Sequence, residues 1–206
     1  MPLPLFDLPP AAQRAWLAER LARPAPQSAL GLSDGFRLPG REVLVPAAVL
    51  VPIVNRPEGL RVLLTERSAH LPDHPGQISF PGGRVEPDDA DDAAAALREA
   101  HEEVGLAPPQ VELLGQLACY ETVTGYRVKP VVGWIEPPIE LAPDPLEVAS
   151  VFEVPLDFLL DPANHLRHFR MLGERRRDYW AMPYQDRYIW GATAAMLVIL
   201  ERTLKA

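Results

Sequence analysis

Three glutamates near the middle of the chain are spaced so that a helix would bring their carboxylates together. Glu99, Glu102 and Glu103 fall within about 100° of arc around a helix axis, and Asp92 falls on the same side. Like charges at this spacing repel by roughly 0.2–0.5 kcal/mol per pair. A cation among them would remove that repulsion, and oxygen ligands suit Mg²⁺ or Mn²⁺. The pattern predicts a metal-binding helix face; the alternative is an ordinary acidic face in solvent.

A glycine pair and an arginine flank these carboxylates. Gly82 and Gly83 let the backbone approach closely, and the carbonyl of Gly83 can itself ligate a metal. Arg98 comes directly before Glu99 and can pair with a carboxylate of the preceding loop. A diphosphate hydrolase needs such a metal cage, together with a positioned water and a base. We therefore place Arg98 among the candidate catalytic residues.

This stretch resembles the Nudix box, the signature of Nudix hydrolases. The matching residues are Gly83, then Arg98-Glu99-Ala100, Glu102-Glu103 and Gly105-Leu106. The resemblance implies hydrolysis of a nucleoside diphosphate linked to another moiety, with Mg²⁺ or Mn²⁺ as the cofactor. It also implies that Glu99 and Glu103 are the leading metal ligands, and that Glu102 is a further ligand or orients the water.

The first half of the box departs from the family pattern. The family usually carries Glu eight residues before Arg98, where this chain has Ala90, and the loop is one residue longer here. Asp89 and Asp91 are the two carboxylates that could pair with Arg98 instead. The departure concerns the partner of Arg98 and leaves the three helix glutamates intact.

A second motif lies just before the glycine pair. It consists of Leu63-Leu64-Thr65, Arg67-Ser68, His74 and Gly76-Gln77-Ile78-Ser79-Phe80-Pro81. The segment resembles that of coenzyme A pyrophosphatases, which implies cleavage of coenzyme A into 3′,5′-ADP and 4′-phosphopantetheine. The substrate-binding residues that we predict are Arg67, His74, Gln77 and Phe80. An arginine at a strand end can offer two donors to a phosphate; the alternative is a surface ion pair, with Gln77 only holding its loop.

One position of this second motif differs from the related enzymes. They usually carry another Arg four residues after Ser68, where this chain has Pro72. If that Arg binds a phosphate in the relatives, this chain needs a cation from elsewhere. The candidates are Arg127, Lys129 and the run of residues 175–177. A solvated arginine run is the alternative for the last of these.

The general base is expected on a loop distant from the box, because Nudix enzymes often take a glutamate from there. Glu147 is the leading candidate, and Glu121 and Glu140 follow it. For each of them the alternative is an ordinary exposed glutamate. Trp180, Tyr184 and Trp190 are expected in the core rather than stacked on a nucleotide base.

Three functions are therefore weighed. The leading hypothesis is metal-dependent hydrolysis of the diphosphate bond of coenzyme A and of its acyl derivatives. The second keeps the Nudix chemistry on another nucleoside diphosphate derivative, such as ADP-ribose or a dinucleotide. The third is a non-catalytic nucleotide-binding module, which retention of all three helix glutamates disfavours.

The elements that must hold these residues can be read from the sequence pattern. We expect a helix over residues 10–22, a hairpin of residues 42–55 and 60–66, and a short strand at residues 77–80. The glutamate helix should end at Gly105, and should bury Ala93, Leu97, Ala100 and Val104, with His101 packed beside them. Further strands are expected at residues 111–122, 126–136 and 148–154, a hairpin at 165–183, and a buried helix from about 189 to 204.

This order of elements, with the resemblance, implies an α/β (α+β) fold, a Nudix-type α/β/α sandwich with a mixed sheet. We divide the chain into an N-terminal helix and loop extension, residues 1–40, and a hydrolase domain, residues 41–206. The extension could serve a homodimer or a lid.

Composition limits the remaining possibilities. The chain has 206 residues and a net charge of −8, which disfavours a nucleic-acid partner and leaves a small nucleotide as the expected one. Cys119 is the only cysteine, so no internal disulfide can form. We see no signal peptide and no apolar run long enough to span a membrane, and we therefore expect a cytoplasmic protein.

Overall fold

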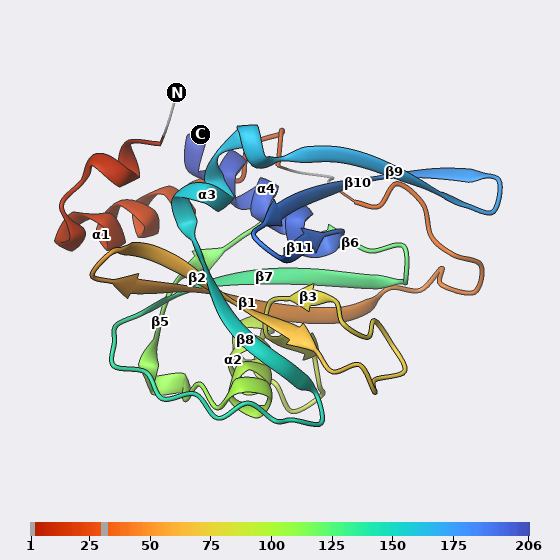
Figure 1. Ribbon diagram of the computed structural model, residues 1–206, viewed down its shortest axis with the longest axis horizontal. Coiled ribbons are helices and arrows are strands. Elements are labelled where there is room, and N and C mark those ends of the chain that lie inside the picture. The colour runs from red at the N-terminus through yellow and green to blue at the C-terminus, as the bar shows by residue number, and fades with distance from the viewer. Residues whose placement is uncertain (1–2, 30–32) are drawn as a thin grey trace.

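A mixed eight-stranded sheet forms the body of the computed structural model, which describes residues 3–29 and 33–206 (Figure 1). Its strands are β1 (Val45–Arg56), β2 (Gly59–Arg67), β3 (Ile78–Ser79), β4 (Gly82–Arg84), β5 (Val111–Gln116), β6 (Tyr120–Glu121), β7 (Tyr126–Ile135) and β8 (Val148–Pro155). The main path runs β3-β2-β1-β7-β5, and β4, β6 and β8 join β1, β7 and β2. Only the β1–β7 pair is parallel within these described strands.

Strand β1 is buried on both faces, which explains its nearly continuous apolar sequence. Ala47, Val51 and Ile53 point into one core, while Leu50 and Val54 point into the other. The helix α2 (Asp92–Val104) covers the second face, and α4 (Ala192–Lys205) packs over the first, together with α1 (Pro10–Leu21) and α3 (Leu156–Leu160) (Figure 1). The expected arrangement of helices on both sides of a mixed sheet is confirmed.

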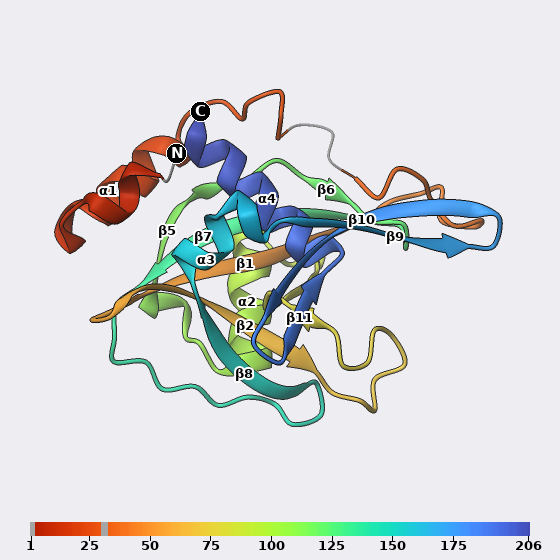
Figure 2. The same cartoon turned by 45° about the horizontal axis from the view of Figure 1, so that its top comes forward.

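A second sheet of three antiparallel strands lies beside α4. Its strands are β9 (Leu166–Leu172), β10 (Arg175–Tyr184) and β11 (Arg187–Trp190), and the β9–β10 hairpin projects from the body (Figure 2). The C-terminal helix was expected from about residue 189 and begins at Ala192 instead. Residues 187–190 are strand because they pair with β10. Gly191, with φ of 67°, makes the turn from β11 into α4.

The N-terminal residues pack on the same body. Leu17 and Leu21 of α1 are buried in the core that contains α4, as the helical spacing predicted. Residues 33–38 then run beside β6: the N–H of Asp34 donates to Glu121 O at 3.0 Å, and that of Leu38 donates to Val123 O at 3.0 Å. The division at residue 40 stays a prediction. No helix in the described residues is long and apolar enough to cross a membrane.

Candidate active site

The helix α2 carries the three glutamates, and both of its ends are fixed by local chemistry. Asp91 is the N-cap, because its carboxylate accepts a hydrogen bond from the N–H of Ala94 at 2.8 Å. Gly105 ends the helix in the left-handed region, at φ of 72°, where glycine is strongly preferred. Ala93, Ala100 and Val104 are buried as expected, and Leu97 is half-buried. The expected packing of His101 is wrong, because its side chain is exposed.

Arg98 connects the loop before α2 to the glutamates. Its Nε donates to Asp89 Oδ1 at 3.0 Å and its Nη2 to Asp89 Oδ2 at 2.9 Å. Its Nη1 donates to Glu99 Oε1 at 3.0 Å and to Glu102 Oε2 at 3.1 Å, and its Nη2 also bonds the carbonyl of Arg84. Asp89 is therefore the partner of Arg98, while Asp91 serves as the helix cap.

Glu103 differs from the other two glutamates because it is buried, with 4% of its surface exposed. The N–H of Gly82 donates to its Oε2 at 3.2 Å, and Arg67 Nη1 lies 3.8 Å from its Oε1. Burial raises the pKa of Glu103 to about 7, against the opposing effects of the Gly82 hydrogen bond and the Arg67 charge. Its charged form is therefore costly unless more positive charge arrives.

Gly83 leaves room for Glu99. A Cβ at position 83 would lie 2.4 Å from Glu99 Oε1 and 2.5 Å from its Cδ, so a side chain there would displace the carboxylate. Burial raises the pKa of Glu99 as well, and the bond from Arg98 opposes the shift. Strand β4 holds Gly83 in place by pairing it with Ala48 of β1.

These residues fit a hard divalent cation. Carboxylates and a backbone carbonyl are the ligands such an ion prefers, and two of the carboxylates have pKa values raised by burial. Within the described residues, no three His, Cys, Asp or Glu side chains are gathered tightly enough to hold an ion as they stand. Arg98 bonds one oxygen of Glu99 and one of Glu102, and the N–H of Gly82 bonds one oxygen of Glu103, so the second oxygen of each carboxylate could ligate the metal while these bonds are kept.

Glu147 lies at the edge of this cluster. The N–H of Ser68 donates to Glu147 O at 2.8 Å, and the N–H of Asp144 donates to Glu103 O at 3.0 Å, so this turn is tied to both motifs. Its side chain is exposed, and its charge raises the pKa of both Glu99 and Glu103. Of the other two candidates for the base, Glu121 is paired with Arg37 at 2.5 Å, and Glu140 is exposed on its loop.

A cavity of about 390 Å³ opens beside Gly83. All four predicted substrate-binding residues line it, namely Arg67, His74, Gln77 and Phe80. Arg67 is about a quarter exposed, and its buried Nε has no hydrogen-bond partner among the described residues, whereas Phe80 is largely enclosed in the core. A larger cavity, of about 960 Å³, lies by α3 at the other end of β2, and the three glutamates of α2 line neither cavity; the smaller one reaches them through Gly83, which lies against Glu99.

The smaller cavity, beside Gly83, is also lined by residues that the sequence did not single out or that were expected elsewhere. Arg177 is buried rather than solvated, and its Nη2 bonds Asp34 Oδ1 at 2.6 Å. Trp190 is half-buried and lines the cavity, as does Arg170. The two other candidate cations, Arg127 and Lys129, do not line it. Alternation along β10 could have separated Arg177 from its neighbours, but no sequence signal points to Asp34.

Comparison with known proteins agrees with the box. The NUDIX domain family matches residues 44–172. A protein of Escherichia coli K12 described as an uncharacterized Nudix hydrolase, NudL, is 47% identical over 156 residues, which cover 73% of this chain and 78% of that protein. The protein of the same description from Enterobacter sp. strain 638 is 45% identical over 155 residues, with the same coverage.

Solved structures give a weaker likeness. The C. elegans Ap4A hydrolase binary complex has a TM-score of 0.47 at 23% identity, covering 54% of this chain and 80% of that one. The M. smegmatis Nudix hydrolase RenU has a TM-score of 0.47 at 25% identity, covering 55% of this chain and 71% of that one.

Proposed function

Because this chain belongs to the Nudix family and is a hydrolase acting on pyrophosphate bonds, we propose that its substrate is coenzyme A or an acyl derivative of it. The products would be 3′,5′-ADP and 4′-phosphopantetheine, or the acylated 4′-phosphopantetheine when an acyl derivative is cleaved. Nudix hydrolases generally use divalent metals, and Mg²⁺ or Mn²⁺ is the proposed cofactor here.

The observation that carries the proposal is the position of the second motif relative to the box. Arg67, His74 and Gln77 line the same cavity as Gly83, and Gly83 lies against the carboxylate of Glu99. A diphosphate in this cavity would lie between the motif residues and the carboxylate helix. Arg67 supports this reading because it lines the cavity and its guanidinium could donate to a phosphate oxygen there.

Each residue of the cluster has a proposed role. Glu99 and Glu103, with Glu102 and the carbonyl of Gly83, would hold the cation. When bound, the cation would neutralise charge on the diphosphate oxygens and make a water more acidic. Glu147 would accept a proton from the water whose oxygen attacks phosphorus, and the P–O bond to the leaving phosphate would break. Arg98 would keep Glu99 and Glu102 in position.

The test is a substrate panel with the metal varied. The protein is incubated with coenzyme A, acetyl-coenzyme A, ADP-ribose and a diadenosine polyphosphate, each with Mg²⁺ or Mn²⁺, and products are separated by liquid chromatography. Release of 3′,5′-ADP and 4′-phosphopantetheine from coenzyme A is expected. Cleavage of ADP-ribose or the dinucleotide without cleavage of coenzyme A would refute the substrate, and Pro72 is the residue that favours this second outcome.

A further inference from the structure

Two arginines face each other across the β9–β10 hairpin. Arg170 of β9 is paired with Arg177 of β10 in the antiparallel register, so both side chains are on the same face of the sheet. That face borders the substrate cavity, and both arginines line it. Like charges directly opposite each other in a sheet are destabilising. The groups that surround the two guanidinia therefore have to offset this repulsion.

Arg177 is buried and shares its carboxylate partner with two other hydrogen-bond donors. Its side chain is 7% exposed, and its buried Nε has no hydrogen-bond partner among the described residues. Its partner Asp34 also accepts from Tyr120 Oη at 2.8 Å and from the N–H of Val123 at 2.6 Å. This one carboxylate therefore accepts hydrogen bonds from three donors, of which only Arg177 is charged. Because Arg177 lines the cavity and one of its N–H groups has no acceptor among the described residues, an anion in the cavity would supply charge and acceptors that the protein does not.

Arg170 has no carboxylate partner in the part of the chain that the structure describes. Its guanidinium lies over the ring of Trp190, 5.1 Å from the centroid, and Trp190 lines the cavity too. Such a contact orients an arginine without neutralising it. The two guanidinia therefore have one carboxylate, that of Asp34, between them. The first turn of α4, at Ala192 and Thr193, borders the same cavity and adds to the positive potential there.

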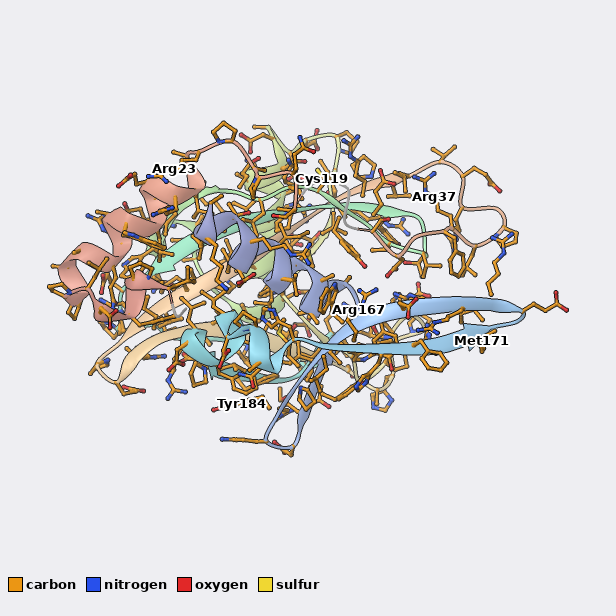
Figure 3. All side chains as sticks on the ribbon, turned by 90° about the horizontal axis from the view of Figure 1, so that it is seen from above. Arg23, Arg37, Cys119, Arg167, Met171 and Tyr184 are labelled. Atoms are coloured by element: carbon orange, nitrogen blue, oxygen red, sulfur yellow. The ribbon has the colours of Figure 1, made fainter. Side chains whose placement is uncertain are left out.

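This positive wall is built from segments that meet only in the folded chain. Asp34 and Arg177 both lie outside residues 44–172, the part matched by the family. The segment that follows residue 33 runs beside β6 and approaches the hairpin (Figure 2). Arg167 and Met171 are labelled on β9 in the view from above (Figure 3). Because side chains alternate along a strand, both are on the opposite face of β9 from Arg170.

We propose that Arg170 and Arg177 bind a second anionic group of the substrate, a phosphomonoester separate from the diphosphate that is cleaved. Asp34 is a positioning residue, because it holds the guanidinium of Arg177 toward the cavity. The inference rests on the proposed function, since coenzyme A carries a 3′-phosphate on its adenosine. It assigns that phosphate to the hairpin side of the cavity, whereas the scissile diphosphate would lie on the side of Gly83.

The test compares coenzyme A with dephospho-coenzyme A, which lacks only the 3′-phosphate. Wild-type protein should prefer coenzyme A in kcat/KM by about 10-fold or more, which is the effect of a charge-assisted hydrogen bond. In Arg170→Gln this preference should fall toward unity through a rise in KM for coenzyme A. Arg176→Gln is the matched control: Arg176 is the neighbouring exposed arginine and pairs with Asp178, so the preference should be kept.

A direct binding measurement separates this inference from the proposed function. Calorimetry without metal should show adenosine 3′,5′-bisphosphate binding about 10-fold more tightly than adenosine 5′-monophosphate, with the difference lost in Arg170→Gln. Equal binding of the two nucleotides by the wild type, or an unchanged difference in Arg170→Gln, would overturn the inference even if coenzyme A is cleaved. If coenzyme A is not cleaved but the difference is found, the anion site stands and the proposed substrate fails.

Discussion

Arg98 and Asp89 meet through two parallel hydrogen bonds, at 3.0 and 2.9 Å, in the loop that leads into α2. The same guanidinium also bonds Glu99 and Glu102. One arginine thus sets the position of two candidate metal ligands, and Asp89 sets the position of the arginine. The side chain of Asp89 is 6% exposed, so this pair is held away from water more than a surface ion pair is.

Replacing Asp89 with Asn should change how stability depends on pH. The bond from Arg98, and then the N–H of Glu86, lower the pKa of Asp89. A carboxyl whose pKa is lowered on folding stabilises the protein above its unfolded pKa, and this contribution is lost as pH falls through the folded value. Asp89→Asn should therefore melt at a lower temperature near neutral pH, and the difference from wild type should shrink on acidification below about pH 4. Thermal melts across this range measure it.

Asp88→Asn is the control for that experiment, because Asp88 is the exposed neighbour in the same loop. Its melting curve should follow the wild type at every pH. Coincident curves for Asp89→Asn and wild type would show that the ion pair contributes nothing to stability, and a difference that stays constant with pH would contradict the lowered pKa of Asp89.

Replacing Glu103 with Gln should remove activity and spare the fold. A metal ligand supplies several kcal/mol of transition-state stabilisation, so kcat should fall by about 1,000-fold. Because burial raises the pKa of Glu103 to about 7, the neutral amide should leave the metal-free melting temperature unchanged or higher. The rise in melting temperature caused by Mn²⁺ should be lost. Glu112→Gln, at a residue paired with Arg14 on the surface, should keep both; wild-type turnover in Glu103→Gln would refute its role.

The two adjacent glycines should respond differently to alanine. At Gly83 the added Cβ meets the movable carboxylate of Glu99, so the fold should be kept while kcat falls by about 100-fold through its displacement. At Gly82 the Cβ would lie 2.4 Å from the carbonyl oxygen of Ala48, which cannot move freely. Gly82→Ala should lose at least about 2 kcal/mol of stability. Chemical denaturation and initial rates for both variants test this; full activity in Gly83→Ala would contradict the close packing.

Replacing Glu147 with Gln should reduce kcat more than it changes KM. Loss of a general base typically costs about 100-fold or more. Glu147, and not Glu140, raises the pKa of Glu99 and Glu103, so Glu140→Gln, which removes the same charge from the same loop, should behave as wild type. A wild-type kcat in Glu147→Gln, equal to that of Glu140→Gln, would exclude Glu147 as the base.

The sequence was most informative where local rules decide the structure. The helical spacing of the apolar residues and Gly105 predict α2, and the apolar runs between turn residues predict most strands of the main sheet. These signals act between near neighbours in the chain, so they can be read from the order of residues.

Contacts made by distant segments could not be read in this way. Glu103 lies on the same helix arc as Glu102, yet one is buried and the other exposed, because Gly82 and Arg67 cover only the first. Arg177 belonged to an arginine run read either as a phosphate-binding cation or as solvated, and it is buried and bonded to Asp34, which lies 143 residues away in the chain. Helical or strand spacing gives the direction of a side chain, but not the element that will cover it.

The parallel pairing of β1 with β7 sets an order in which the site can assemble during synthesis. Val45 pairs with Tyr126 and Val54 with Ile135, so β1 stays half-paired until residue 135 has left the ribosome. By then β4 and α2, which carry Gly83 and the three glutamates, are already available to pack on β1. Arg170, Arg177 and Trp190 emerge later still. The nascent chain therefore acquires its carboxylates before it acquires the wall that would select a substrate.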